Sequence, residues 1–292
     1  MQSQKSFEEH QQGTLYVIPT PIGNLQDITL RALETLKQVH TVAAEDTRNT
    51  KKLFNHFEIP TPLISYHEHN RKAREQMLLD LLREGKDVGL VSDAGMPAIS
   101  DPGQELVQAA AEAGFPVVVL PGANAALVAL VGSGLSTDSY QFYGFLPRKK
   151  KDLMGELDKL RKVPATLLFY ESPHRLKETL AAMLESFGDR RVALGRELTK
   201  RYEEFLRGTL QQALDWASSE TVRGEFCVVV EGASEAEQLQ EEQAFWQDMN
   251  VQEHVEWYME NEDLPSKQAI KQVAVDRQLP KRDVYQAYHV EE

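Results

Sequence analysis

The sequence lacks the residues that build disulfides and cysteine-rich metal sites. Cys227 is the only cysteine among 292 residues, so no intrachain disulfide can form and a cysteine-rich zinc site is excluded. Cys227 itself is expected to be a small buried hydrophobe. His67 and His69 stand near an expected strand end without a third candidate ligand, so we expect no metal.

An apolar leader is also missing, and no uninterrupted membrane span is present. The first twelve residues are polar, which predicts no secretory signal. Residues 113–137 carry no charge and are long enough to span a bilayer, but prolines and glycines interrupt them. A buried strand over 117–120, a turn and a buried helix over 123–131 fit better. We expect a cytoplasmic protein with no membrane partner.

The length and the 41% apolar content are those of a globular chain with about two domains. In the first 135 residues apolar strands alternate with amphipathic helices, which predicts a mostly parallel sheet covered on both faces. The expected strands there are 15–19, 41–44, 63–66, 88–91 and 117–120. The expected helices are 29–39, with Leu30, Leu33 and Leu36 on one side, and 47–57, 70–84, 103–113 and 123–131.

A small polar stretch at 132–139 marks the best domain boundary. Beyond it the α/β pattern continues more loosely. The expected strands are 141–146, 165–170, 192–195, 201–208 (with the alternation of an antiparallel strand) and 226–231, and the helices are 152–162, 173–187 and 210–218. The predicted organisation is an N-terminal α/β domain (13–135), a C-terminal α/β domain (136–232), an acidic connecting segment (233–263) and a helix-turn-helix-like tail (264–292).

The net charge of −13 by itself argues against a nucleic-acid partner, but the distribution of the charge weakens that argument. Residues 232–263 carry ten acidic side chains and no Lys or Arg, leaving 32 basic against 35 acidic residues elsewhere. Local basic patches, rather than total charge, report phosphate contacts, although any one patch is more often a solvated helix face. The patches relevant below include Arg48, Lys149, Lys150, Lys267, Lys271, Lys281 and Arg282.

The tail has the pattern of two short helices. Ser266 is the expected N-cap of a helix over 267–276, and Pro280 stands at the start of a second helix. Two such helices could bind DNA, bind RNA or pack as a small core, and charge alone does not separate these alternatives.

The candidate binding segments of the first half follow its expected strands, where ligands bind in open α/β sheets. They are residues 19–24, 91–103 and 120–126. No dinucleotide fingerprint, phosphate-binding P-loop or G-x-S-x-G elbow is present. The acidic loop at Asp93 suits a cationic or ribose-bearing ligand, with helix capping as the alternative. Small residues around Gly122 would let a flat ligand approach the backbone.

Three further strand ends gather Glu, Asp and Arg: residues 44–48, 170–175 and 195–200. Charged side chains at such positions form either a reactive site or an ion-pair network that covers the sheet. The sequence alone leaves both alternatives open.

These segments together resemble the tetrapyrrole methylase superfamily. The matching stretches are LYVIPTPIGNL (15–25), AAEDTR (43–48), SDAGMP (92–97) with SDPG (100–103), FYESPHR (169–175) and RELTK (196–200). The match runs from about Gly13 to the end and is most similar to the branch that methylates a cytidine 2′-hydroxyl in 16S ribosomal RNA. Met96 stands where the family often has Thr, and Ala123-Asn124 depart from its usual Pro-Gly-Pro context.

The resemblance implies S-adenosylmethionine in a cleft between two α/β domains, a homodimer, and the small ribosomal subunit as partner. Its cofactor positions fall on Pro21, Asp93, Gly95, Ile99, Asn124, Ala125, Tyr170 and Leu198.

Methylation of a ribose hydroxyl benefits from a base, because the hydroxyl is a poor nucleophile at neutral pH. The candidate acid–base and orienting residues are Glu171 with Arg175, Glu45, Asp46 and Glu197, each of which could instead form a structural ion pair. Two other functions stay open: a small-molecule methyltransferase acting on a tetrapyrrole, and a non-catalytic RNA- or DNA-binding module on a methylase fold. The tail and basic patches argue against the first, and the intact cofactor loops argue against the second.

Overall fold

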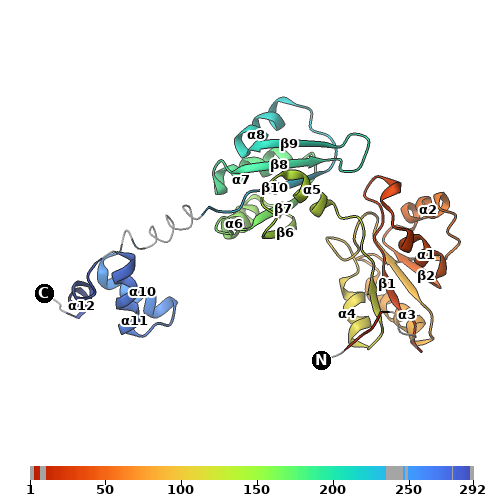
Figure 1. Ribbon diagram of the computed structural model, residues 1–292, viewed down its shortest axis with the longest axis horizontal. Coiled ribbons are helices and arrows are strands. Elements are labelled where there is room, and N and C mark those ends of the chain that lie inside the picture. Colours follow the sequence, from red (N-terminus) through yellow and green to blue (C-terminus); the bar gives the residue numbers. More distant parts are fainter. Residues whose placement is uncertain (1–2, 7–10, 235–245, 247–248, 278, 290–292) are drawn as a thin grey trace. The chain divides into compact units, whose positions relative to one another are not determined.

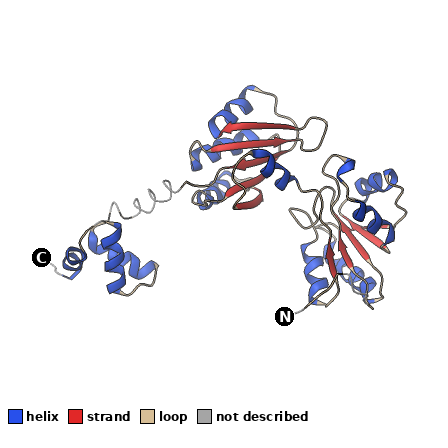
Figure 2. Ribbon diagram, in the orientation of Figure 1, coloured by secondary structure: helices blue, strands red, loops and turns tan. Residues whose placement is uncertain are grey.

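The computed structural model describes residues 3–6, 11–234, 246, 249–277 and 279–289. Two compact units make up the chain: Met1–Asp158 with Ala165–Glu231, and Lys159–Pro164 with Gly232–Glu292. The first unit contains two five-stranded sheets, and helices of the second lie near the C-terminus (Figures 1 and 2). The predicted fold class, two α/β regions and a small helical tail, is confirmed.

The first sheet is entirely parallel, as the apolar strands predicted. Its order is β3-β2-β4-β1-β5, so β4 and β1 are flanked on both sides by other strands. Leu15 pairs with Val88 on one side and with Val117 on the other. The strands are β1 (Leu15–Val17), β2 (Thr41–Ala44), β3 (Leu63–Ser65), β4 (Val88–Val91) and β5 (Val117–Val119).

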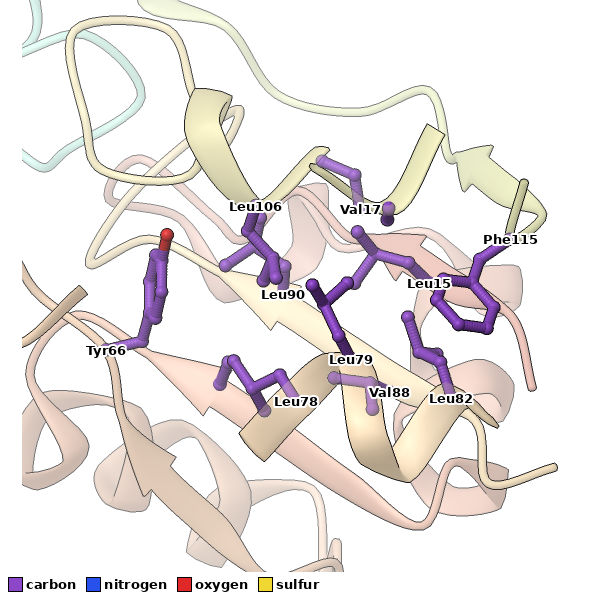
Figure 3. Close-up of a cluster of buried hydrophobic side chains, with 12 residues drawn as sticks. Leu15, Val17, Tyr66, Leu78, Leu79, Leu82, Val88, Leu90, Leu106 and Phe115 are labelled. Carbon is purple, nitrogen blue, oxygen red and sulfur yellow. The ribbon is translucent and has the colours of Figure 1, made fainter. Parts of the chain in front are cut away.

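Helices cover both faces of this sheet. One face packs against α3 and α4, and the other against α1 and α2. Figure 3 shows Leu82 of α3 beside Leu15 of the sheet, within the buried cluster that also contains Leu78 and Leu90. The elements are the 3-10 helix η1 (Leu25–Asp27) and the α-helices α1 (Leu30–Gln38), α2 (Thr47–His56), α3 (Arg71–Arg83) and α4 (Gln104–Glu112).

The second sheet is mixed, in the order β6-β7-β10-β8-β9. Only β6 and β7 run parallel, while β10 pairs antiparallel with both β7 and β8. The antiparallel strand expected over 201–208 is present as β9, paired with β8. The elements are β6 (Tyr140–Phe145), α6 (Lys150–Leu160), β7 (Thr166–Glu171), α7 (Leu176–Phe187), β8 (Arg191–Arg196), β9 (Glu204–Thr209), α8 (Leu210–Ser219) and β10 (Phe226–Val230).

Helix α5 (Ala125–Ser133) packs against the second sheet, although it precedes the boundary expected at 135/136. Ala126, Ala129 and Leu130 contact a cluster that includes Leu168 and Val229. The N-terminus of α5 therefore lies where the loop after β5 meets the second sheet.

Several apolar side chains expected to be buried are exposed instead. Leu30, the first residue of α1, is 80% exposed, whereas Ala32 and Leu36 of the same helix are buried. The strand expected to be buried over 117–120 is the edge strand β5, with Val119 55% exposed. The helix expected to be buried over 123–131 exposes one face, on which Val131 is 75% exposed.

Three helices near the C-terminus share one small core. They are α10 (Val251–Asn261), α11 (Ser266–Asp276) and α12 (Lys281–His289). Val255, Ile270, Val273 and Val284 are buried in it, so the helix from the acidic segment packs with the two tail helices. The Ser266 cap prediction is wrong, because Pro265 occupies the N-cap position and Ser266 is the first helical residue.

Within the described part of the chain, no helix has both the length and the apolar character needed to cross a bilayer. The uncharged stretch 113–137 forms β5 and α5, as the strand–turn–helix interpretation predicted.

Gly122 lies where the loops that follow β1 and β5 pack closely against each other. A Cβ atom at Gly122 would lie 2.6 Å from the Cβ of Pro19. The lack of a side chain at Gly122 therefore permits this loop packing.

Gly122→Ala is expected to lower the free energy of unfolding by about 1–3 kcal/mol, because the rigid proline ring cannot move aside. Gly155→Ala is the matched control. Gly155 lies inside α6, and a Cβ atom there would meet nothing within 4 Å, so alanine should stabilise the protein by about 0.5–1 kcal/mol. Urea denaturation of both variants measures these changes, and equal stabilities would contradict the packing role of Gly122.

Candidate functional site

A cavity of about 450 Å³ lies where strand ends of the two sheets meet α5. The loop after β4 forms one wall with Gly95, Ile99 and Asp101. The opposite wall comes from the second sheet, with Tyr170 at the end of β7 and Leu198 after β8. The volume is within the usual range for small-molecule sites.

Two loops of this cavity hold an uncommon backbone conformation. Six non-glycine residues of the described chain have positive φ, and four of them lie in these loops. They are Ala98 (67°) and Ser100 (64°) in the loop after β4, and Glu197 (48°) and Thr199 (66°) after β8. Such conformations cost energy and gather at ligand clamps, so both loops have the character of binding loops.

Hydrogen bonds hold the loops against one another. Thr20 and Gly95 exchange backbone hydrogen bonds of 2.9 Å in both directions, which joins the loop after β1 to the loop after β4. The backbone N–H of Asn24 donates to Oγ1 of Thr199 at 3.2 Å and joins the first loop to the second sheet. The site is thus built on fixed backbone.

Six of the eight predicted cofactor residues line the cavity: Gly95, Ile99, Asn124, Ala125, Tyr170 and Leu198. The other two, Pro21 and Asp93, line a neighbouring pocket of about 360 Å³, with Lys52 and His56 of α2. Asn124 also caps α5, because its side chain accepts a hydrogen bond from the N–H of Leu127 at 3.1 Å.

Asp93 ties the end of β4 to the start of α2. Its Oδ1 accepts a hydrogen bond from the N–H of Asp46 at 3.0 Å, and its Oδ2 accepts one from Nδ2 of Asn49 at 2.9 Å. The alternative that Asp93 caps the helix after its own loop is wrong, since Gly103 holds the N-cap position of α4.

Glu171 and Arg175 form a buried structural network. Alternation along β7 puts Glu171 on the strand face opposite Tyr170, and Oε2 of Glu171 accepts a hydrogen bond from Oγ1 of Thr179 at 2.6 Å. Its Oε1 accepts from the N–H of Ser172 at 2.7 Å and lies 3.8 Å from the Arg175 guanidinium. Arg175 also donates to the carbonyls of Leu146 and Pro147.

The acidic candidates after β2 differ in environment. Asp46 is the N-cap of α2 and pairs with Arg48, whose hydrogen bonds lower the pKa of the Asp46 carboxyl to about 2. Arg48 is 87% exposed and lies at this cap. Burial raises the pKa of Glu45, and the nearby Asp93 and Asp46 charges add to that rise.

Glu197 is paired and charged. Partial burial raises the pKa of its carboxyl, but hydrogen bonds from the N–H of Glu225 and from Lys200 outweigh burial and leave the pKa lowered overall. Lys200 Nζ lies 3.0 Å from Oε1 of Glu197 and 2.8 Å from Oε2 of Glu225.

Sequence reasoning missed Asp101 as a site residue. Its carboxyl lines the cavity, and burial raises its pKa to about 6, with the Glu45 charge adding to the rise. The signal was present in Ser100-Asp101-Pro102-Gly103 after an apolar strand, but the sequence did not show which carboxylate of that loop faces the cavity. Cys227 is buried as expected, and desolvation raises the pKa of its thiol to about 12.

The predicted RNA-contacting cations fall into separate groups. Lys149 and Lys150 are exposed at the start of α6. Lys267 and Lys271 are exposed on α11, and Lys281 and Arg282 are exposed at the start of α12.

Arg277, by contrast, is structural. Its guanidinium donates to Nδ1 of His254 at 3.1 Å and to the carbonyl of Trp246 at 2.9 Å, and it lies over the Trp246 ring. Burial, helped by the Arg277 charge, lowers the pKa of His254 to about 4. In the described residues no group of three His, Cys, Asp or Glu side chains is arranged to hold a metal ion.

The sequence of the two sheets identifies the chain as a methylase. Residues 14–214 match the family of tetrapyrrole (corrin/porphyrin) methylases, and the chain belongs to this family. Two curated relatives are both named ribosomal RNA small subunit methyltransferase I. The one from Halalkalibacterium halodurans is 54% identical and the one from Bacillus subtilis 53% identical, each match covering 100% of both chains.

Solved structures share the fold at low identity. A diphthine synthase matches with a TM-score of 0.60 at 13% identity, over 78% of this chain and 94% of its own. A uroporphyrin-III C-methyltransferase from Thermus thermophilus, in complex with S-adenosylhomocysteine, matches with a TM-score of 0.55 at 19% identity, over 75% and 97%.

Glu171→Ala tests the structural role of the Glu171–Arg175 network. It would leave Thr179 and Arg175 without their carboxylate, and we expect a loss of about 3 kcal/mol in the free energy of unfolding. Glu178→Ala, at an exposed position of α7, is the control and should change stability by less than about 0.5 kcal/mol. Denaturant titration measures both, and a fully stable Glu171→Ala protein would make Glu171 a candidate base again.

Proposed function

We propose that this protein uses S-adenosylmethionine to methylate the 2′-hydroxyl of a cytidine in 16S ribosomal RNA. The observation that carries the substrate is the full-length identity of 53–54% to relatives whose names specify the small-subunit ribosomal RNA. The two solved structures described above are below 25% identity and support the fold alone. The choice of ribose over base rests on the family resemblance of the motifs.

The cavity suits S-adenosylmethionine in size and chemistry. The small residues Gly95, Ala125 and Gly195 would let a flat adenine lie close to the backbone of the cavity wall. Ile99 and Leu198 supply apolar contact. Acidic side chains in the cavity wall, Glu197 among them, favour a cationic ligand over an anionic one. The bound cofactor would supply an electrophilic methyl group on a sulfonium.

The chain's own task is then to align an acceptor and manage its proton. The methyl already carries a neutral leaving group, so rigid positioning of the acceptor supplies much of the rate. The strained loops around Ser100 and Thr199 and the exchanged hydrogen bonds between Thr20 and Gly95 support such rigidity.

The exposed lysines of α11 and α12 support RNA binding by the tail. Phosphate contacts need exposed cations, and Lys267, Lys271, Lys281 and Arg282 are exposed, whereas Arg277 is committed to the core. Lys149 and Lys150 supply a second candidate contact, and Arg48 a third.

We further propose a homodimer and a cytoplasmic site of action. The exposed apolar face of α5, with Leu127, Val128 and Val131, supports association with a second copy, because apolar patches on soluble proteins mark interfaces. The cytoplasmic site follows from the proposed ribosomal substrate.

The direct test is to incubate the protein with radiolabelled S-adenosylmethionine and either 30S particles, naked 16S RNA or uroporphyrinogen. Label is expected in ribosomal RNA, at a ribose that resists alkaline cleavage. Label in uroporphyrinogen and none in RNA would favour the tetrapyrrole alternative. Cofactor binding without transfer to any acceptor would favour a non-catalytic role.

The tail's role is tested by neutralising its exposed cations. The changed residues are Lys267, Lys271, Lys281 and Arg282, each replaced with Gln. The variant should bind 30S particles more weakly. The logarithm of its binding constant should also fall less steeply with the logarithm of the salt concentration, because each lost phosphate contact lowers that slope by about 0.7–0.9. Cofactor affinity should stay unchanged. Lys37→Gln with Lys177→Gln, exposed on α1 and α7, is the matched control. An unchanged salt slope would reduce the tail to a packing role.

A further inference from the structure

Asp101 is held at a fixed place in the cavity wall. It follows Ser100, whose φ is 64°, and precedes Pro102 and Gly103, whose φ is 140°. A Cβ atom at Gly103 would lie 2.8 Å from Leu90, so this end of the loop packs directly on β4. The backbone of the loop therefore fixes where the Asp101 side chain leaves the cavity wall.

The other carboxylates of the cavity wall are already occupied. Both oxygens of Glu171 accept hydrogen bonds, from Ser172 and Thr179. Oε1 of Glu197 binds Lys200 and the N–H of Glu225, and Glu225 pairs with the same lysine. Among the described residues, no Lys or Arg forms an ion pair with Asp101. It is thus the cavity carboxylate that has capacity to take up a proton.

We propose that Asp101 is the catalytic base that accepts the proton of the acceptor hydroxyl. This inference rests on the proposed methyl transfer. In that step the ribose 2′-oxygen forms a bond to the methyl carbon, and the carbon–sulfur bond breaks with its electron pair passing to sulfur. The hydroxyl proton passes to the Asp101 carboxylate, which later releases it to water.

The surroundings of Asp101 match that task. Glu45 after β2 and Asp93 after β4 face it with negative charge, and both act with burial to disfavour its ionised form. From β7 the Tyr170 hydroxyl stands near it, and burial raises the pKa of that phenol to about 12, so Tyr170 stays neutral. Across the cavity, Glu171, Glu197, Lys200 and Glu225 complete the titratable wall. A base poised near neutral pH combines sufficient ionisation with sufficient basicity.

Glu45 is the competing base, since burial also raises its pKa. It does not line the cavity, and its Oε2 faces the backbone N–H of Asp93 at 3.4 Å. Glu45 could therefore not take a proton directly from a hydroxyl bound in the cavity.

The experiment compares wild type, Asp101→Asn, Glu45→Gln and the control Asp80→Asn, which changes an exposed aspartate of α3. Methyl transfer to saturating 30S particles is followed under single-turnover conditions from pH 5 to pH 8.5. In wild type the rate should fall as pH drops below about 6, because Asp101 becomes protonated. Asp101→Asn should lower the rate by about 10²–10⁴-fold and remove this pH dependence. Asp80→Asn should behave as wild type.

Two readouts do not depend on turnover. Calorimetry with S-adenosylhomocysteine should give Asp101→Asn an affinity within about threefold of wild type. Melting temperatures should also diverge with pH. The folded-state pKa of Asp101 is raised from 3.8 to about 6, so wild type loses stability between these values as pH rises, and Asp101→Asn does not. The melting-temperature difference should grow up to about pH 6 and then stay constant.

The outcomes separate this inference from the proposed function. If wild type neither binds S-adenosylhomocysteine nor methylates 30S particles, the proposed function fails. If wild type is active and Asp101→Asn keeps its rate or its pH dependence, the base assignment is overturned. Loss of the pH dependence in Glu45→Gln alone would move the assignment to Glu45. Lost cofactor affinity in Asp101→Asn would make Asp101 a binding residue.

Discussion

The site depends on two reciprocal backbone hydrogen bonds between Thr20 and Gly95. They cross-link the loops that leave β1 and β4, two adjacent interior strands of the parallel sheet. With this link in place, the chain after Gly95 must turn back sharply, and it does so through the positive φ values of Ala98 and Ser100. Packing of the sheet beneath stabilises these strained conformations. The backbone of the cavity wall therefore leaves its side chains few positions to occupy.

Strand alternation then assigns opposite roles to two adjacent residues of β7. Tyr170 lies on the face shared with α5 and lines the cavity, while the Glu171 side chain reaches Thr179 of α7. A charged cluster at a strand end therefore mixes groups that bind ligand with groups that brace the sheet. Charge and position along the strand do not distinguish them, because the direction of each side chain depends on register.

The sequence could predict most of the fold, because buried parallel strands and amphipathic helices leave strong periodic patterns. Its errors have a common cause. Leu30, Val119 and Val131 are apolar, and apolar character was equated with burial, but β5 is an edge strand and α5 has only one face on the second sheet. Sequence patterns report what a segment could bury, and tertiary position decides what it does bury. The sequence did not identify Asp101 as a site residue for the same reason, since only the tertiary structure decides which side chain faces a cavity.

The negative charge of the cavity limits how a polyanionic substrate such as RNA could bind there. Four acidic side chains and one lysine line the cavity, an arrangement that suits a cationic cofactor and repels phosphates. An RNA acceptor would therefore bring only a ribose toward these carboxylates and keep its backbone at a distance. The attraction for that backbone would have to come from cations elsewhere, and the exposed lysines of α11 and α12 belong to a helical core of their own. In such an arrangement no cation needs to pair with the base, so the base stays basic enough to take a proton. The cations of the helical core supply the affinity for RNA instead.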